Sequence, residues 1–256
     1  GLRTQNLYEP WPEEGNRKII GALSQYHFAP TDSAKCNLLA ENIPAGNILV
    51  TGNTVIDALL QSREIIKQFS EVKNSLDQRF SFLSETKRLV LLTIHRRESF
   101  GSGLESVCRS VSTLISEFQD IEVVVPVHPN PNISSYIRSE LSSKSRVHLI
   151  EPQDYLPFIY LMERSHIIMT DSGGVQEEAP SLGKPVIVLR NTTERPEAVE
   201  AGTVKLVGTK ETTILSEMRT LLSSPKDYEK MASAHNPYGD GNAVLKIMDF
   251  MRKIER

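Results

Sequence analysis

The sequence predicts an α/β protein built on a doubly wound parallel sheet. Apolar runs that fit strands alternate with stretches that fit helices from about residue 89 to the C-terminus, the order of a parallel sheet with helices on both faces. The run at 89–93 is almost continuously apolar, as expected for a parallel strand covered on both sides. The segments that carry Gly, His and charged residues follow the strands, where ligands bind in such sheets.

The expected elements cover most of the chain after a polar, proline-containing opening at 1–18. We expect a short buried strand or a turn at 27–30 and a strand followed by a turn at 48–53. We expect further strands at 89–93, 121–127, 147–150, 167–170, 185–189 and 204–207. We expect helices at 13–26, 31–39, 55–69, 104–118, 134–141, 155–163, 174–182, 198–201, 210–223, 228–234 and 242–254. Thr31 is the predicted N-cap of the second helix. The polar stretch 67–85 is predicted to be a linker or an irregular helix between domains.

Composition excludes several classes of protein. The chain of 256 residues has a formal net charge of -3 and no long basic run, which argues against nucleic acid as a partner. Cys36 and Cys108 lie far apart in the sequence, so a disulfide framework or a zinc site is not expected, and reduced cytosolic thiols are. No apolar run reaches the length of a membrane span, and no signal peptide is visible. We therefore expect a cytoplasmic protein with no nucleic-acid or membrane partner.

The segment 170–179, which joins an apolar strand to a helix, carries the strongest local signal. Ser172, Gly173 and Gly174 fall where the helix begins, and free backbone N–H groups and the helix dipole there favour an anion such as a pyrophosphate. Glycine also lets a phosphate approach the backbone closely. The Glu178 carboxylate can accept hydrogen bonds from two ribose hydroxyls. An ordinary Ser-Gly-Gly turn that caps a helix explains the same residues, so this motif alone leaves both interpretations open.

A second candidate site, 93–101, also follows a buried strand. His95 can donate to a phosphate or act as an acid or base, and Arg96 and Arg97 carry guanidinium groups suited to phosphate or carboxylate. A solvated charged loop with a structural histidine is the alternative. The arrival of a His and two cations together after a buried strand favours the functional interpretation.

The remaining polar motifs are weaker. Glu13 and Glu14 fall in the first turn of a predicted helix, where the helix dipole alone explains a pair of solvated acidic residues. His128 follows another strand, but a single His is little evidence for a functional site. The segment 193–197 also follows a strand, and 235–241 can be a structured turn.

Taken in order, a series of segments resembles the signature motifs of the non-hydrolysing UDP-N-acetylglucosamine 2-epimerases. The segments are Gly1-Leu2-Arg3-Thr4, Pro10-Trp11-Pro12-Glu13-Glu14, Thr51-Gly52-Asn53-Thr54-Val55-Ile56-Asp57, His95-Arg96-Arg97-Glu98, Thr170-Asp171-Ser172-Gly173-Gly174, Thr193-Glu194-Arg195-Pro196-Glu197-Ala198 and His235-Asn236-Pro237-Tyr238-Gly239-Asp240-Gly241. The resemblance covers essentially the whole chain. The ordered series is specific, although no single member is.

The resemblance implies two Rossmann-like domains of the GT-B type that face each other across a cleft. Residues 1–56 match the trailing part of the N-terminal domain, 57–238 a complete UDP-binding domain, and 239–256 a helix that crosses back to the first domain. Residue 1 is Gly rather than Met, and Gly1 falls just after one of the family's catalytic acids. We therefore expect the N-terminal domain to be incomplete in these 256 residues, which on that expectation bind UDP but epimerise poorly.

The resemblance also implies an activity, the interconversion of UDP-N-acetylglucosamine and UDP-N-acetylmannosamine. UDP is eliminated to leave a 2-acetamidoglucal, then adds back after protonation at C2 from the other face, supplying N-acetylmannosamine for cell-surface polysaccharide. The expected partners are UDP-N-acetylglucosamine, UDP and a second copy of the chain in a homodimer. The alternatives are a GT-B glycosyltransferase, a hydrolysing epimerase and a UDP-sugar-binding module without activity. The Pro-Trp-Pro-Glu-Glu segment favours the epimerase over the glycosyltransferase.

Roles for single residues follow from the same resemblance. Glu13 matches a catalytic carboxylate, and His95 matches the catalytic-site histidine near the diphosphate. The matched substrate-binding positions are Ser172, Gly173 and Gly174 at the diphosphate, Glu178 at the ribose, Phe158 beside the uracil and Arg195 near the nucleotide. The positions that match a second, activating UDP-N-acetylglucosamine site are Glu14, Arg96 and His128. The sequence has no Asp-x-Asp pair to hold a cation near the diphosphate, and we expect neither a metal nor a cofactor.

Overall fold

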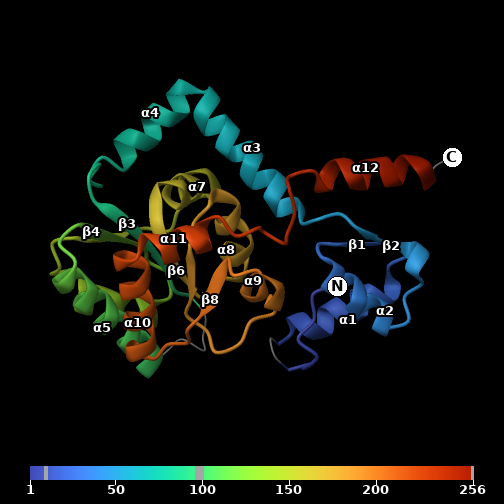
Figure 1. The fold of residues 1–256 in the computed structure, drawn as a ribbon, viewed down its shortest axis with the longest axis horizontal. Helices are drawn as coiled ribbons and strands as arrows, with labels where there is room; N and C mark the ends of the chain where they lie inside the picture. Colours follow the sequence, from blue (N-terminus) through green and yellow to red (C-terminus); the bar gives the residue numbers. More distant parts are fainter. Residues whose placement is uncertain (9–10, 96–100, 255–256) are drawn as a thin grey trace.

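A computed structural model describes residues 1–8, 11–95 and 101–254 of the chain. A large lobe built on one sheet (residues 54–238) stands beside a small lobe (residues 1–50) (Figure 1). The chain passes between the lobes twice, at 51–53 and at 239–242. Within the described ranges, no helix is both long enough and apolar enough to cross a membrane.

The large lobe contains a six-stranded, all-parallel sheet in the order β5-β4-β3-β6-β7-β8. The strands are β3 (Arg88–Thr93), β4 (Ile121–Pro126), β5 (Val147–Ile150), β6 (Ser165–Thr170), β7 (Val186–Val188) and β8 (Val204–Leu206). The chain runs outward from β3 to β5, then returns to β3's other side with β6 and runs outward again. The point where the strand order reverses, between β3 and β6, is where doubly wound sheets open a crevice for ligands. The predicted parallel sheet is confirmed.

Helices cover both faces of this sheet. The sheet separates the buried apolar residues of the large lobe into two hydrophobic clusters, one on each face. The helices are α3 (Thr54–Gln68), α4 (Ser70–Arg79), α5 (Ser102–Glu117), α6 (Pro131–Leu141), α7 (Tyr155–Arg164), α8 (Gly173–Glu178), the 3-10 turn η3 (Ala179–Leu182), α9 (Pro196–Glu200), α10 (Glu211–Ser223) and α11 (Pro225–Ala232). Val90 and Leu92 of β3 pack with α5, α6 and α10, whereas Leu89 and Leu91 pack with α3, α7 and α8. Because alternate residues of a strand face opposite sides, a strand buried on both sides must be apolar throughout. Each such side chain contributes about 1.5–3 kcal/mol through burial.

The prediction of a linker or irregular interdomain helix at 67–85 is wrong. Residues 70–79 form the regular helix α4, and Leu76, Phe80 and Leu83 are buried in the same cluster as α7. The Phe80 ring stacks on Tyr160 at 5.5 Å between centroids, and the Tyr160 hydroxyl donates to Asp77 at 2.6 Å. A few well-spaced apolar anchors are enough to pack an otherwise polar helix onto the large lobe.

The small lobe has a two-stranded parallel sheet and two main helices. Its elements are α1 (Glu13–Leu23), β1 (His27–Ala29), α2 (Asp32–Ala40), the 3-10 turn η1 (Ala45–Asn47) and β2 (Ile48–Val50). The predicted N-cap is confirmed, because the Thr31 hydroxyl oxygen accepts from the Ala34 amide at 3.1 Å. Ala29 and Leu38 belong to a small core of their own.

The two crossings of the chain meet at a pair of glycines. Gly52 and Gly239 both have positive φ, 86° and 120°, and a Cβ atom added to Gly52 would lie 3.2 Å from the Gly239 Cα. The next residue, Asn53, donates its backbone N–H to the Tyr238 carbonyl at 2.7 Å. Only residues without a side chain let two backbones pass this closely, so the glycines here are required by the fold.

The C-terminal helix α12 (Ala243–Ile254) begins on the large lobe and lies along the small one (Figure 1). The Asp57 carboxylate on α3 accepts from the backbone N–H groups of Ala243 (3.1 Å) and Val244 (2.9 Å). A carboxylate at a helix N-terminus is favourable because it satisfies exposed N–H groups and faces the positive end of the helix dipole. Near the other end, the Phe250 ring packs edge-on against Phe28 and Tyr26. The helix therefore bridges the two lobes.

Candidate functional site

The glycine-rich turn lies at the carboxyl end of β6, beside the point where the strand order reverses. α8 begins at Gly173, with Ser172 as its N-cap in an extended conformation. The Thr170 hydroxyl accepts from the Ser172 amide at 2.9 Å and lies 2.6 Å from the Thr93 hydroxyl of β3. These contacts tie the turn to the ends of two neighbouring strands, and they place the first N–H groups of α8 at the edge where a ligand would enter.

Arg195 covers the start of α8. Its side chain is almost buried, and a Cβ atom added to Gly173 would lie 2.5 Å from its Nη1 atom. Arg195 Nε donates to Glu177 at 2.6 Å, and Nη1 donates to Glu194 at 3.2 Å. The helix N-terminus and a fixed guanidinium group therefore share one place, a combination suited to an anion with several oxygens.

A second arginine, Arg190, stabilises this arrangement through Glu194. Arg190 Nη1 donates to Glu194 at 2.9 Å, and both side chains are buried. Burial by itself would raise the pKa of Glu194, but the hydrogen bond from Arg190 and the charges of both arginines lower it to about 2. Glu194 therefore stays ionised and holds Arg195 in place by charge.

His95 follows β3 and is held by Asp171, which follows β6. The His95 backbone N–H donates to both Asp171 carboxylate oxygens, at 3.1 and 3.0 Å. The ring atom Nδ1 lies 3.0 Å from Asp171 Oδ1. Asp171 is fully buried, whereas the His95 side chain is 41% exposed. One carboxylate thus fixes both the backbone and the ring of a histidine that remains open to solvent.

The structure brings His95, His128 and Phe158 together. All three line one pocket of about 170 Å³ at the carboxyl ends of β3 and β4. The rings of His95 and His128 stack at 6.2 Å between centroids. His128 Nδ1 accepts from the Asn130 amide at 3.2 Å, which leaves its Nε2 atom as the N–H donor when the ring is neutral.

Phe158 is linked to Glu178 through α7. Tyr155 lies three residues before Phe158 in this helix, and its hydroxyl donates to Glu178 Oε1 at 2.6 Å. Burial raises the pKa of Glu178, and the hydrogen bond from Tyr155 opposes that rise. Tyr155 was not among the site residues predicted from the sequence, although its spacing from Phe158 places the two aromatic rings on one helix face.

Glu177 is a second functional candidate that was not predicted from the sequence. One carboxylate oxygen accepts from Arg195, the other from the side-chain amide of Asn53, and the Glu177 carbonyl accepts from Asn236 at 2.8 Å. Asn53 belongs to the first crossing between the lobes and Asn236 precedes the second. Glu177 is therefore one buried residue with three connections. It contacts Arg195, which covers Gly173, and it contacts the chain at or beside both crossings.

The two acidic residues at the start of α1 have different environments. Glu13 is exposed, as expected for a solvated helix start. That expectation is wrong for Glu14, which is fully buried, because its carboxylate accepts from the backbone N–H groups of Thr4 (3.1 Å) and Gln5 (3.2 Å). The segment before α1 folds back over this side chain. No contact within the described ranges joins Glu13 to His95 or α8.

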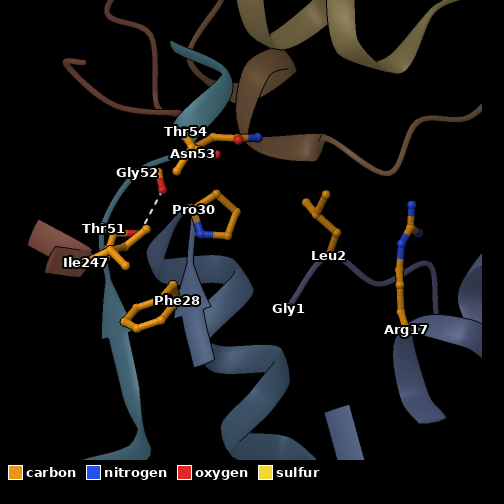
Figure 2. Close-up of a pocket in the computed structure, with 10 residues that line it drawn as sticks. All are labelled: Gly1, Leu2, Arg17, Phe28, Pro30, Thr51, Gly52, Asn53, Thr54 and Ile247. Atoms are coloured by element: carbon orange, nitrogen blue, oxygen red, sulfur yellow. Dashed lines mark hydrogen bonds between the residues drawn. The ribbon is translucent and has the colours of Figure 1, made fainter. Parts of the chain in front are cut away.

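An opening of about 370 Å³ lies between the small lobe and the first crossing. Figure 2 shows Arg17 of α1, Leu2 of the N-terminal segment and Asn53 of the crossing around it. Arg17 Nη1 lies 3.7 Å from Glu14. Arg96, predicted to belong to an activator site, falls outside the described residues, so its position stays a prediction.

The parallel sheet, with a glycine-rich turn at its carboxyl edge and a second lobe across from it, defines an α/β protein of the GT-B type. A family model described as UDP-N-acetylglucosamine 2-epimerase matches residues 1–252. The chain belongs to the UDP-N-acetylglucosamine 2-epimerase family. The resemblance stated from the motifs is confirmed, as is the isomerase class that it implied.

Relatives of known sequence support this assignment. The chain is 53% identical over 253 residues to the UDP-N-acetylglucosamine 2-epimerase of Neisseria meningitidis, a match that covers 99% of this chain and 68% of that relative. It is 50% identical over 252 residues to the enzyme of that name from Escherichia coli K12, with 98% and 67% covered. The chain thus spans about two thirds of the length of these relatives.

Solved structures show the same similarity in three dimensions. The structure of the N. meningitidis epimerase bound to UDP-GlcNAc has a TM-score of 0.94 at 53% identity, covering 99% of this chain and 68% of that one. The Methanocaldococcus jannaschii epimerase, in complex with UDP-GlcNAc and UDP, has a TM-score of 0.83 at 32% identity, with 99% and 67% covered. The wall teichoic acid polymerase TagF, at 15% identity and a TM-score of 0.58 over 94% of this chain and 61% of that one, shares the fold alone. The predicted GT-B architecture is confirmed by these matches.

Proposed function

We propose that this protein interconverts UDP-N-acetylglucosamine and UDP-N-acetylmannosamine with the nucleotide bound at the carboxyl edge of the large sheet. The observation that carries the proposal is the convergence on that edge of the α8 turn, Arg195, His95 and Phe158, which come from separate strand ends. Residues 57–238 form the UDP-binding unit in this proposal. Residues 1–56 carry the sugar-facing acid, and 239–256 return to the first unit.

The diphosphate binds at the start of α8. In this proposal the N–H groups of Gly173 and Gly174, the hydroxyl of Ser172 and the guanidinium of Arg195 contact it together. The Ser172 N–H does not, because it donates to the Thr170 hydroxyl. Because Glu177 and Glu194 hold Arg195 before any ligand arrives, its side chain loses little freedom on binding. No group of His, Cys, Asp or Glu side chains suited to a metal ion occurs in 1–8, 11–95 or 101–254, and the proposed site rests on protein donors.

The nucleoside extends from there toward α7. Glu178 accepts hydrogen bonds from the ribose hydroxyls through its carboxylate, one oxygen of which is oriented by Tyr155. Phe158 lies one turn of helix further on and offers its ring to the uracil. A charged acceptor held by a neutral donor keeps its orientation without losing its charge.

The chemistry at the sugar is an elimination followed by an addition. A base removes the proton from C2, the C1–O bond breaks with its electron pair on the diphosphate oxygen, and a C1=C2 double bond forms in the 2-acetamidoglucal. UDP then adds back to C1 while a proton reaches C2 from the other face. Proton transfer requires groups within hydrogen-bond reach of C2, and exposed Glu13, on the small lobe, is one of them in this proposal.

The further proposals concern the assembly and its regulation. Arg96 and His128 contribute to a second, activating UDP-N-acetylglucosamine site, and buried Glu14 acts there by holding residues 4 and 5 through their amides.

The proposed assembly is a homodimer. The active form is a cytoplasmic homodimer that supplies N-acetylmannosamine for cell-surface polysaccharide. Light scattering coupled to size-exclusion chromatography measures the oligomeric state directly.

The proposed reaction is tested by NMR in deuterated water. Incubation of the protein with UDP-N-acetylglucosamine should yield UDP-N-acetylmannosamine with deuterium at C2, because the proton taken from C2 exchanges with solvent. Release of free N-acetylmannosamine would instead identify a hydrolysing enzyme. Sugar transfer that appears only with an added acceptor would identify a glycosyltransferase.

Two neighbouring glycines provide a matched test of the diphosphate site. Gly173→Ala is expected to weaken UDP binding about tenfold, or about 1.4 kcal/mol, because the new Cβ lies 2.5 Å from Arg195 Nη1 and displaces the guanidinium. Gly174→Ala should change the affinity much less, since its nearest neighbour, Glu178 Oε2, is 3.8 Å away, an ordinary contact. Calorimetric titration with UDP compares the two. Equal affinities for the two variants would place the diphosphate elsewhere.

A further inference from the structure

Asp171 lies between the two halves of the proposed site, and its geometry is unusually constrained. Its backbone N–H donates to the Thr93 carbonyl at 3.2 Å, which continues the pairing of β6 with β3. On its C-terminal side, the Ser172 amide is held by the Thr170 hydroxyl. Asp171 is 0% exposed, so the position of its carboxylate is set by the sheet itself.

This carboxylate makes two kinds of contact with His95. Both oxygens accept from the His95 backbone N–H, and one lies 3.0 Å from ring atom Nδ1. An ionised carboxylate can only accept hydrogen bonds. The proton of the imidazole is therefore held on Nδ1, and the ring cannot turn without losing that bond. Nε2 then lies on the far side of the ring, and the side chain is 41% exposed toward the pocket that His128 and Phe158 also line.

We propose that Asp171 is a positioning residue, which holds Nδ1–H of His95 so that Nε2 points to the diphosphate of the bound nucleotide and donates to it when the ring is protonated. This inference rests on the proposed function and deepens it. Asp171 is separated from Gly173 by a single residue, so one rigid turn sets the distance between the imidazole and the first N–H groups of α8. A neutral amide could hold the His95 backbone, but only an anion both accepts from Nδ1–H and stabilises a positively charged ring.

The arrangement matters most while UDP departs. Negative charge grows on the diphosphate as the C1–O bond breaks. A protonated His95 ring keeps Nδ1–H on Asp171 and donates a second N–H from Nε2, so it interacts more strongly with the transition state than with the bound substrate. Loss of the aspartate charge should therefore lower kcat much more than it raises KM. A residue that only supported the fold would change the amount of active protein or both constants together.

Asp171→Asn keeps the size of the side chain and one oxygen acceptor while it removes the charge. We expect kcat to fall on the order of a hundredfold or more, as for other enzymes whose histidine loses its aspartate, and KM to change by less than about threefold. The matched control is Asp120→Asn. Asp120 precedes β4 at the opposite end of the sheet, where its half-exposed carboxylate pairs with Arg88, and this variant should keep the kcat of the unmodified protein. A kcat for Asp171→Asn within threefold of the unmodified value would overturn the proposal.

Nitrogen-15 NMR provides a measurement that needs no enzyme activity. Long-range proton–nitrogen correlations distinguish the Nδ1–H from the Nε2–H form of a neutral histidine, and the His95 signal is identified by its loss in His95→Gln. The unmodified protein should show the Nδ1–H pattern, and Asp171→Asn should shift it toward Nε2–H. An Nε2–H pattern in the unmodified protein refutes the role of Asp171 even if Asp171→Asn fails to fold. The two claims can fail separately. An Nδ1–H pattern in a protein that yields no deuterated UDP-N-acetylmannosamine supports the role of Asp171 and contradicts the proposed reaction.

Discussion

Replacing Arg195 by methionine is expected to lower the free energy of unfolding by about 3–5 kcal/mol, the range found when one partner of a buried ion pair is removed. The guanidinium donates to Glu177 and Glu194, and all three side chains are nearly or fully buried. Methionine fills much of the same space but leaves both carboxylates without one of their donors. Urea denaturation followed by circular dichroism measures the loss.

The matched control for this variant is Arg138→Met. Arg138 donates to Glu151 at 2.8 Å, a contact of similar length, but both side chains are exposed. An exposed ion pair contributes roughly 0–1 kcal/mol, so this variant should stay within that range. If the two variants lose the same free energy, burial of the Arg195 pairs is not what stabilises the site.

The ion pair between Arg195 and Glu194 should also make the free energy of unfolding depend on pH. The pKa of Glu194 is lowered from 4.5 to about 2 in the folded protein, so the unfolded chain binds a proton first as the solution is acidified. The stabilisation from Glu194 is therefore complete above about pH 4.5 and is lost as the pH falls toward 2. In Arg195→Met this loss should be smaller, since one of the charges that lowers the pKa is gone.

Replacing Glu178 by alanine is expected to weaken UDP binding by about 1.5–3 kcal/mol, the range for hydrogen bonds to a charged group. Uracil alone should lose far less affinity, because it has no ribose for Glu178 to bind. Calorimetry with both ligands separates the two effects. Glu151→Ala, which removes a carboxylate that is 79% exposed, is the control and should leave both affinities unchanged. Equal losses for UDP and uracil with Glu178→Ala would exclude a contact with the ribose.

The sequence was most informative where local rules and burial agree. The run at 89–93 had to be apolar throughout because β3 faces two helical layers, and periodicity alone predicts this. The rule that ligands bind at the carboxyl ends of parallel strands correctly grouped His95 and His128 with the Ser-Gly-Gly turn. The roles of these residues came from the family resemblance and not from spacing.

The features that the sequence concealed depend on contacts between distant segments. Burial of Glu14 requires residues 4 and 5 to fold back over α1, and no local pattern signals this return. Glu177 differs from its neighbour Glu178 only in helix face, yet it is the one that reaches both Arg195 and Asn53. The helix α4 was hidden for a related reason, since its polar composition outweighs the few apolar residues that anchor it.

The close passage of Gly52 over Gly239 limits how the two lobes can move. Because both crossings run through one point and are hydrogen-bonded there, a rotation of the small lobe has its pivot at these glycines. Atoms near the pivot, such as those of Asn53, move little, while Glu13 travels through a long arc. Helix α12 is fastened at its first turn to Asp57 on the large lobe and rests through Phe250 on the small one. Each such rotation must therefore slide the Phe250 ring across Phe28 and Tyr26 or bend α12 between its two points of attachment. In this way α12 resists the opening and closing of the lobes.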